Sequence, residues 1–268
     1  MPPIADVSSK PIPELVSLSG RRAVVTGGAR GLGKAIAQRL AEAGAGVLIG
    51  DLDQASARTT AADLSRSCNA KVLAIGLDVT DSASVIAVAD FALEQMGGID
   101  IWVNNAGIFP RSMLLDMTDA DWDRVLDVDL RGVFMGCREA ARRMIAAGHG
   151  GVLINVASTA GYKGVRAGLA HYVASKHGVR GLTRQLALEL APQAIRVLAV
   201  APTLIVTEGV IASQKTTASA GGEIHGVPNH LGRPGVPDDV ARVVLFCASD
   251  LSLFMTGSTL PVDAGELL

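Results

Sequence analysis

Short aliphatic runs alternate with longer helical patterns along this chain, and this alternation is the strongest constraint on its fold. The runs cover residues 23–25, 47–49, 72–75, 101–103, 152–154 and 197–200, and a last run with a proline covers 259–262. Because the runs are apolar on both faces, they indicate a parallel sheet that helices cover on both sides. One helix is predicted to begin at Thr118, with Asp121 completing a capping box, and to continue past Phe134. We therefore expect an α/β fold with a doubly wound parallel sheet of about seven strands.

A single domain accounts for the length. The chain has 268 residues, and 49% of them are hydrophobic, which is enough for one large core. Residues 1–19 contain several prolines without periodicity, so they are predicted to be a loosely held N-terminal extension of the domain at 20–268. Residues 208–231 are small and polar, which favours a flexible loop over a substrate site; an ordinary surface loop is the alternative. The proline in 259–262 predicts a strand at the sheet edge, because proline cannot donate to the ladder.

Charge and cysteine content exclude several function classes. The net charge is −2 with the two signs interspersed, so no basic surface is expected for nucleic acid or an anionic membrane. Cys68, Cys137 and Cys247 lie far apart without metal-ligand spacing, so no metal site is predicted. The N-terminus lacks a basic start, and no run of eighteen apolar residues follows. We expect a cytoplasmic protein whose partner is a small molecule.

A glycine-rich turn follows the first predicted strand and opens a helix. Gly27, Gly31 and Gly33 allow backbone N–H groups to approach a pyrophosphate at the positive end of that helix. Asp51 follows the second strand, where a carboxylate would accept hydrogen bonds from a ribose diol. The turn therefore predicts a dinucleotide site, with a purely structural turn as the alternative. Asp51 would repel the extra phosphate of NADP, so NAD is favoured, although Arg30 could reach such a phosphate.

Tyr172 and Lys176 are four residues apart, which places a phenol and an ammonium on one face of a helix. A free tyrosine ionises near pH ~10, and an adjacent fixed positive charge favours the phenolate. The pair can therefore serve as a proton-transfer centre. The alternative is a half-buried aromatic ring beside a solvated lysine.

Together these motifs resemble the short-chain dehydrogenase/reductase family, from about residue 20 to the end. The resemblance rests on Thr-Gly-x-x-x-Gly-x-Gly at 26–33, Asp-Val at 78–79, Asn-Asn-Ala-Gly at 104–107, Ser158, the Tyr172-x-x-x-Lys176 pair, Ala-Pro at 201–202 with Thr207, Gly-Arg-Pro at 232–234, Thr-Gly at 256–257 and Val-Asp-Ala-Gly at 262–265. The resemblance implies a Rossmann-like domain, a nicotinamide cofactor and a homotetramer.

The resemblance also implies roles for individual residues. Tyr172 would exchange a proton with the alcohol oxygen, Lys176 would bind the nicotinamide ribose, and Ser158 would donate a hydrogen bond to the substrate oxygen. The implied cofactor contacts are Gly27, Arg30, Gly31, Leu32, Gly33, Asp51, Leu52, Asp78, Val79, Asn105, Ala106, Gly107, Tyr172, Lys176, Pro202, Thr203, Ile205 and Thr207. The candidate substrate contacts are Ser158, Tyr172, Phe109, Tyr162 and Thr203.

The chain departs from the family pattern in three places. Asp129 stands where the family usually has an asparagine that holds a water leading to the lysine, so it is added to the catalytic set; if ionised, it would partly neutralise Lys176 through that water. Ser158 lies one residue further from Tyr172 than the pattern predicts, so Thr159 is the alternative, although Ser158 fits Asn-x-x-Ser. Thr203 and Ala264 replace glycines.

The sequence thus favours an NAD-dependent oxidoreductase that acts on a secondary alcohol, polyol or sugar, or on the matching ketone. A protein that binds NAD without turnover, as a sensor or scaffold, is the alternative from a different class, and Asp129 is the feature that favours it. An isomerase with transient hydride transfer is a third reading.

Overall fold

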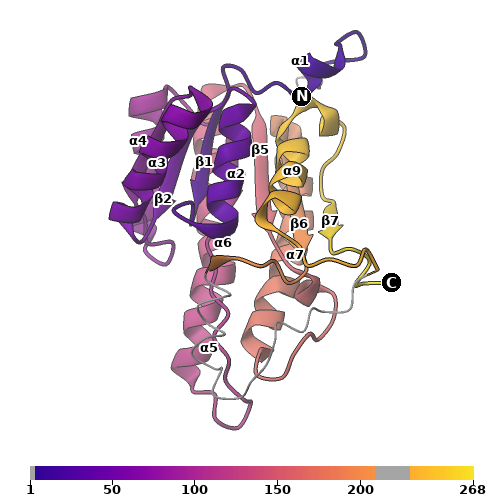
Figure 1. Ribbon diagram of the computed structural model, residues 1–268. Helices are drawn as coiled ribbons and strands as arrows, with labels where there is room; N and C mark the ends of the chain where they lie inside the picture. Colours follow the sequence, from indigo (N-terminus) through magenta and orange to yellow (C-terminus); the bar gives the residue numbers. More distant parts are fainter. Residues whose placement is uncertain (1–3, 209–229) are drawn as a thin grey trace.

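The computed structural model describes residues 4–208 and 230–268 (Figure 1). The strands are β1 (Arg22–Thr26), β2 (Gly46–Asp51), β3 (Val72–Gly76), β4 (Ile101–Asn104), β5 (Gly151–Val156), β6 (Ile195–Pro202) and β7 (Thr259–Val262). The α-helices are α1 (Ile12–Val16), α2 (Gly31–Glu42), α3 (Gln54–Cys68), α4 (Ser82–Met96), α5 (Asp119–Leu126), α6 (Gly132–Ala147), α7 (Ala170–Leu190) and α9 (Pro237–Ala248). Short π and 3-10 turns are η1 (Asp127–Arg131), η2 (Thr159–Gly161), η3 (Ala191–Gln193) and η4 (Asp250–Ser252). Most of the predicted substrate loop, 209–229, lies outside the described residues.

The strands form one parallel sheet in the order β3-β2-β1-β4-β5-β6-β7. The strand order reverses between β1 and β4, the place where open α/β sheets bind ligands at their carboxyl ends. The predicted fold class is confirmed. β7 lies at the edge of the sheet, as Pro261 predicted.

Neighbouring strand residues point to opposite faces of the sheet. Because the strands are apolar on both sides, helices cover both faces. Val25 belongs to the core under α2, α3 and α9, whereas Val24 belongs to the core under α4, α6 and α7. Both side chains are fully buried. The carboxyl ends of the strands point toward α5 in Figure 1, and α1 lies at the opposite end of the sheet. Within the described residues, no helix is long and apolar enough to cross a membrane.

Local sequence explains how a typical helix, α4, begins and ends. The Asp81 side chain caps it by accepting from the amides of Ala83 and Ser84. Gly97 ends it with a φ of 81°, a left-handed conformation that glycine adopts without strain. Buried residues at helical spacing between these ends face the sheet and are Val85, Val88, Ala89 and Ala92.

The structure bears on two local expectations. The capping box of Thr118 and Asp121 is present, but the helix that it starts gives way to the π turn η1 before α6 begins. The described part of the N-terminal extension, predicted to be loosely held, contains the short helix α1, and its Lys10 pairs with Asp250 at 2.8 Å.

Candidate active site

The glycine turn after β1 packs so closely against the surrounding chain that side chains would not fit at several of its positions. Gly27 and Gly31 have positive φ angles of 65° and 54°. A Cβ on Gly27 would lie 2.9 Å from the Cα of Ala106, and one on Gly33 would overlap the carbonyl of Gly27. Arg30, the residue before α2, provides no side-chain cap for that helix. The first N–H groups of α2 can therefore serve an anionic ligand such as a pyrophosphate, so the turn fits the predicted cofactor.

Residues after β4 hold the glycine turn in place. The hydroxyl of Thr26 accepts hydrogen bonds at 3.0 Å from the amides of Asn105 and Ala106. The Asn105 side chain donates in return to the carbonyls of Thr26 at 2.9 Å and Gly27 at 3.0 Å. The predicted cofactor residues Asn105 and Ala106 are thus brought against the turn, and the Asn105 amide supports it.

Asp51 lies where β2 ends, beside the same turn. One carboxylate oxygen accepts from the amide of Ala29 and the other from the amide of Asp53, both at 3.0 Å. These bonds orient the carboxylate and leave lone pairs for a ribose diol. The next side chain, Leu52, is 78% exposed, and Arg30 is exposed as well. The structure therefore brings three of the predicted cofactor residues together.

The other predicted cofactor contacts lie at the same ends of the strands. The Asp78 carboxylate accepts from the amide of Thr80 at 2.8 Å and from its hydroxyl at 2.7 Å, which fixes the loop that also carries Val79. A Cβ on Gly31 would lie 3.4 Å from the Cβ of Thr207, so the segment after β6 reaches the glycine turn. Ile205 is buried and pairs with Gly235 in an isolated bridge.

Three of the four predicted catalytic side chains lie just after β5 or on α7. Ser158 follows β5, and its hydroxyl accepts from the amide of Ala160 at 3.1 Å. Lys176 is buried, its ammonium donates to the carbonyl of Val156 at 3.1 Å, and it lies 5.5 Å from the centre of the Tyr172 ring. The half-exposed ring of Phe109 packs edge-on against Tyr172 with their centres 6.0 Å apart. Phe109 and Tyr172, both predicted substrate contacts, are therefore neighbours.

Asp129 contacts Lys176 directly. A carboxylate oxygen of Asp129 lies 3.2 Å from the ammonium, and the other accepts from the amide of Ile108 at 2.8 Å. The predicted coupling through a water is therefore corrected: the charges form a buried ion pair. The reason is geometric, because the π turn η1 carries Asp129 fully buried toward α7.

Burial and the neighbouring charges shift the pKa values of both Asp129 and Lys176. It raises the pKa of Asp129, and the charge of Lys176 offsets only part of that effect. Burial also acts to lower the pKa of Lys176, but the nearby Asp129 and Tyr172 outweigh it and the pKa is raised. Each group thus binds its proton more tightly than usual, and Lys176 stays an ammonium at neutral pH.

His171, the residue before Tyr172, is fully buried. Its Nδ1 accepts from the amide of Tyr172 at 2.8 Å, and its Nε2 has no hydrogen-bond partner among the described residues. A protonated His171 would favour the Asp129 carboxylate. A histidine next to Tyr172 gives no local signal of such burial, because its environment depends on how α5 packs on α7.

Glu266, near the C-terminus, is the site residue that sequence reasoning missed. Its carboxylate accepts hydrogen bonds from Thr203 and, at 3.4 Å, from Thr159. Thr159 is buried beside Ser158, so the Ser158 hydroxyl is the more accessible of the two. No motif marks Glu266, because its contacts with Thr203 and Thr159 join residues 63 and 107 positions apart.

Tyr162 is held elsewhere than the other predicted substrate contacts. Its hydroxyl donates to the carbonyl of Thr259 at 3.4 Å, and the Arg180 guanidinium lies 3.3 Å from its ring centre. These contacts place the ring between α7 and β7. Its role as a substrate contact stays a prediction that these contacts do not support.

The chain matches a known family over most of its length. A family model described as enoyl-(acyl carrier protein) reductase matches residues 27–266. The chain is 39% identical over 249 residues to trans-4-hydroxycyclohexanecarboxylate dehydrogenase of Sinomonas cyclohexanicum, covering 91% of this chain and 92% of the relative. It is 38% identical over 253 residues to L-2,3-butanediol dehydrogenase of Corynebacterium glutamicum, covering 91% and 98% respectively.

Solved structures agree with these relatives. A short-chain type dehydrogenase/reductase from Mycobacterium marinum superposes with a TM-score of 0.86 at 35% identity, covering 94% of this chain and 98% of that one. The relatives confirm the predicted enzyme class, an alcohol dehydrogenase or ketone reductase with a nicotinamide cofactor. The chain therefore belongs to the short-chain dehydrogenase/reductase family.

Proposed function

We propose that this enzyme is an NAD-dependent oxidoreductase that interconverts a secondary alcohol and the matching ketone, with Tyr172 as the acid or base. The observation that carries the proposal is the grouping of Ser158, Tyr172 and buried Lys176 at the carboxyl ends of the strands, next to the glycine turn. Ligands of open α/β sheets bind at this edge.

Each catalytic side chain has a distinct task. A nicotinamide cofactor held by the glycine turn would supply or accept the hydride. Tyr172 gives its hydroxyl proton to the substrate oxygen in reduction, which leaves a phenolate, and in oxidation the phenolate takes up the alcohol proton. The Ser158 hydroxyl donates a hydrogen bond to the same oxygen, where negative charge grows in the transition state. Lys176 keeps a positive charge 5.5 Å from the Tyr172 ring, where it offsets the negative charge that forms on the phenol oxygen during proton transfer.

Asp51 supports NAD as the cofactor. Its carboxylate is fixed by the amides of Ala29 and Asp53 at the end of β2. A 2′-phosphate placed there would meet a negative charge, whereas a ribose diol would donate to it. The exposed Arg30 beside this position is the feature that favours NADP. Comparing kcat/KM for the two cofactors tests the choice, and a preference for NADP would contradict it.

The substrate class is narrowed by what the relatives act on. The names of two of them specify a hydroxylated cyclohexane carboxylate and a vicinal butanediol. We expect this enzyme to oxidise small cyclic or vicinal secondary alcohols, with Phe109 forming an apolar wall beside Tyr172. The test is a panel of cyclic alcohols, diols, polyols, sugars and their ketones, with NADH absorbance at 340 nm as the readout. Measurable NADH binding without turnover on any of them would favour a sensor or scaffold role instead.

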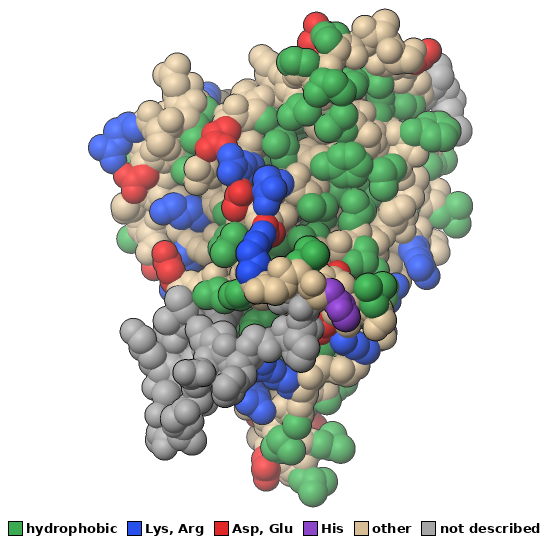
Figure 2. Space-filling view, turned by 45° about the vertical axis from the view of Figure 1, so that its right-hand side comes forward, with side chains coloured by type: hydrophobic (Ala, Val, Ile, Leu, Met, Phe, Trp, Pro, Cys, Tyr) green, Lys and Arg blue, Asp and Glu red, His purple; other side chains and the backbone are tan. Residues whose placement is uncertain are grey.

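The assembly proposed is a homotetramer in the cytoplasm. β7 is an edge strand, and Figure 2 shows hydrophobic side chains spread over the face that carries α9 and the C-terminal part of the chain. Residues of this part include Leu251 and Phe254, which are 41% and 98% exposed. Exposed apolar area of this kind marks contact surfaces. Light scattering during size-exclusion chromatography tests the proposal, and a monomeric mass would contradict it.

A further inference from the structure

The C-terminal turn crosses the catalytic serine segment and is fixed by its own side chains. Asp263 folds the turn by accepting from the amides of Gly265 and Leu267 at 3.0 Å. Glu266 lies within this turn, and only 8% of its side chain is exposed. Such a carboxylate needs partners, because burying an unpaired charge is costly.

Three residues supply those partners. The hydroxyls of Thr203 and Thr159 each donate a hydrogen bond to the same carboxylate oxygen of Glu266. Lys163 lies 3.3 Å from the other oxygen and also donates to the backbone carbonyl of Glu266 at 2.9 Å. Thr203 follows β6, whereas Thr159 and Lys163 follow β5, so a single side chain joins the ends of two neighbouring strands.

A second, weaker link joins the same two segments. The hydroxyl of Ser158 donates to the carbonyl of Pro202 at 3.4 Å. Catalysis requires that hydroxyl to turn to the substrate oxygen, and the link is then lost because a serine hydroxyl has one proton. The bonds through Glu266 use other donors, so they stay in place during the reaction.

We propose that Glu266 is a positioning residue that holds the Ser158 segment against the end of β6 while the Ser158 hydroxyl serves the substrate. The inference rests on the proposed function for the role of Ser158. In this arrangement the Thr203 hydroxyl donates its hydrogen bond to Glu266, so it does not donate one to the cofactor or the substrate. Glu266 touches neither reacting atom, and it acts through Thr203 and Thr159.

Kinetics and hydrogen exchange test this role together. Glu266→Ala is expected to lower kcat about 10- to 100-fold, the cost of a catalytic group misplaced by about 1 Å, while NADH affinity stays within about twofold. Glu266→Gln keeps an oxygen that accepts from both threonines, so it should recover most of the turnover. Glu42→Ala is the matched control, because Glu42 pairs with Arg39 at 2.7 Å on α2, outside the site.

Hydrogen exchange gives a readout that does not depend on turnover. The amides of residues 159–163 should exchange faster in Glu266→Ala than in wild type, while residues 105–108 exchange at the wild-type rate. If wild type turned over no substrate, the proposed function would fail and exchange would still decide the role of Glu266. Wild-type exchange and wild-type kcat in Glu266→Ala would overturn the inference. If that variant does not fold, Thr203→Val removes one donor alone, and unchanged exchange and turnover in it would overturn the inference equally.

Discussion

The two ends of the sheet both bury charge, but they do so in different ways. At the carboxyl ends, Asp129 and Lys176 form an ion pair with almost no exposure. At the amino ends, Arg22 pairs with Asp100, and Arg196 is buried at the start of β6. The difference lies in how completely the polar atoms are satisfied.

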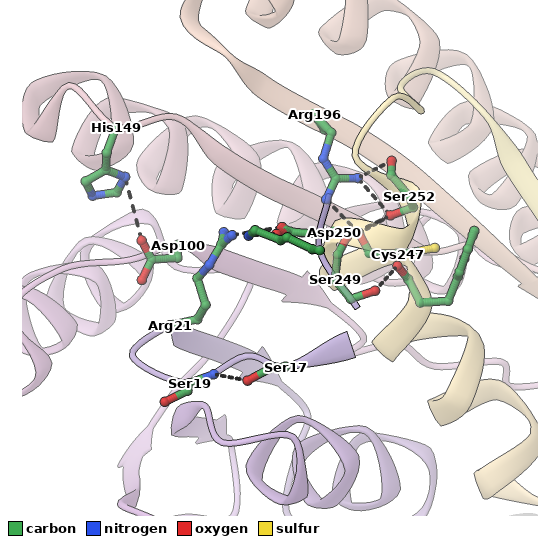
Figure 3. A network of polar contacts seen from close by, with 12 residues as sticks. Ser17, Ser19, Arg21, Asp100, His149, Arg196, Cys247, Ser249, Asp250 and Ser252 are labelled. Atoms are coloured by element: carbon green, nitrogen blue, oxygen red, sulfur yellow. Dashed lines mark hydrogen bonds and ion pairs between the residues drawn. The ribbon is translucent and has the colours of Figure 1, made fainter. Parts of the chain in front are cut away.

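Charges at the amino ends are well satisfied, as Figure 3 shows for Arg196 and its neighbours. Arg196 donates to the carbonyl of Cys247 at 2.9 Å and to the carbonyl and hydroxyl of Ser252 at 3.2 and 3.1 Å. Burial lowers its pKa to about 10, so it remains charged at neutral pH. Arg22 forms a two-pronged contact with Asp100 at 2.6 and 2.8 Å.

Charges at the carboxyl ends are under-satisfied by comparison. Among the described residues, Asp129 Oδ2 has no partner other than the Lys176 ammonium at 3.2 Å, and His171 Nε2 has no hydrogen-bond partner. Buried polar atoms of this kind are rare and call for an explanation such as a catalytic role. A buried charge alone therefore does not identify a site; its place at the ligand-binding edge beside Tyr172 is what makes the Asp129–Lys176 pair a candidate.

The comparison predicts that changes at the carboxyl ends reduce turnover without unfolding the protein. The largest effect is expected for Tyr172→Phe, which removes only the hydroxyl that carries the proton. Turnover should fall by about 1,000-fold, within the range for loss of a general acid or base. NADH affinity and the melting temperature should stay near wild type, which fluorescence titration and calorimetry measure. Retained turnover would remove Tyr172 from the proton-transfer role.

Changes at the amino ends should have the opposite result. Arg196→Met leaves the carbonyls of Cys247 and Ser252 without their donor in a buried place. We expect the free energy of unfolding to fall by about 3 kcal/mol, the typical cost of breaking a buried charged contact. Urea denaturation measures this loss, and kcat per folded molecule should be unchanged at low temperature. If Arg196→Met were as stable as wild type but had a reduced kcat, charges at the amino ends would affect turnover rather than stability, and the comparison would fail.

At the carboxyl ends of the strands, variants of Ser158 and Thr159 distinguish a catalytic hydroxyl from a supporting one. Ser158→Ala removes the donor to the substrate oxygen and should lower kcat about 100-fold, as loss of such a donor typically does. Thr159→Ala leaves that donor and removes only the 3.4 Å bond to Glu266, so its effect should be smaller. Steady-state kinetics with one alcohol decide between them. A greater loss in the threonine variant would reassign the catalytic hydroxyl.

Local patterns predicted the features at the carboxyl ends that depend on spacing within one element. The glycine turn, the capping box at Thr118, the edge position of β7 and the shared helix of Tyr172 and Lys176 are of this kind. Each is set by backbone geometry or side-chain periodicity over a few residues.

The direct contacts between distant elements escaped prediction, although the resemblance had already coupled Asp129 to Lys176 through a water. Asp129 reaches Lys176 only because a π turn separates α5 from α6 and changes the helical register there. Glu266 reaches Thr203 and Thr159 because the C-terminal turn folds back over β5 and β6. The burial of Arg196 likewise depends on η4 packing beneath β6. Spacing along the chain contains no information on these packings.

The smallest predicted effect is a shift in pH dependence rather than a loss. The Asp129 carboxylate offsets part of the positive field of Lys176, so Asp129→Asn should strengthen the lysine's effect on the Tyr172 hydroxyl. The rising limb of kcat/KM for alcohol oxidation should then move to lower pH by about 1 unit, the shift that one nearby charge typically causes. Because burial raises the pKa of Asp129, wild type should approach the variant as the pH falls and this carboxyl takes up a proton.

Asp100→Asn is the matched control from the amino ends, because it also neutralises a carboxylate paired with a cation. Burial opposes the Asp100 charge, but the bonds from Arg22 outweigh it and hold the pKa of Asp100 below its usual value. The stability from this pair is therefore present at neutral pH and is lost as the pH falls through that lowered pKa. Asp100→Asn should lower the melting temperature most near neutral pH and leave the pH–rate profile in place. If Asp129→Asn and wild type gave superimposable profiles, Asp129 would join Asp100 as a structural charge, and the distinction between the two ends would have to rest on Tyr172 and Ser158 alone.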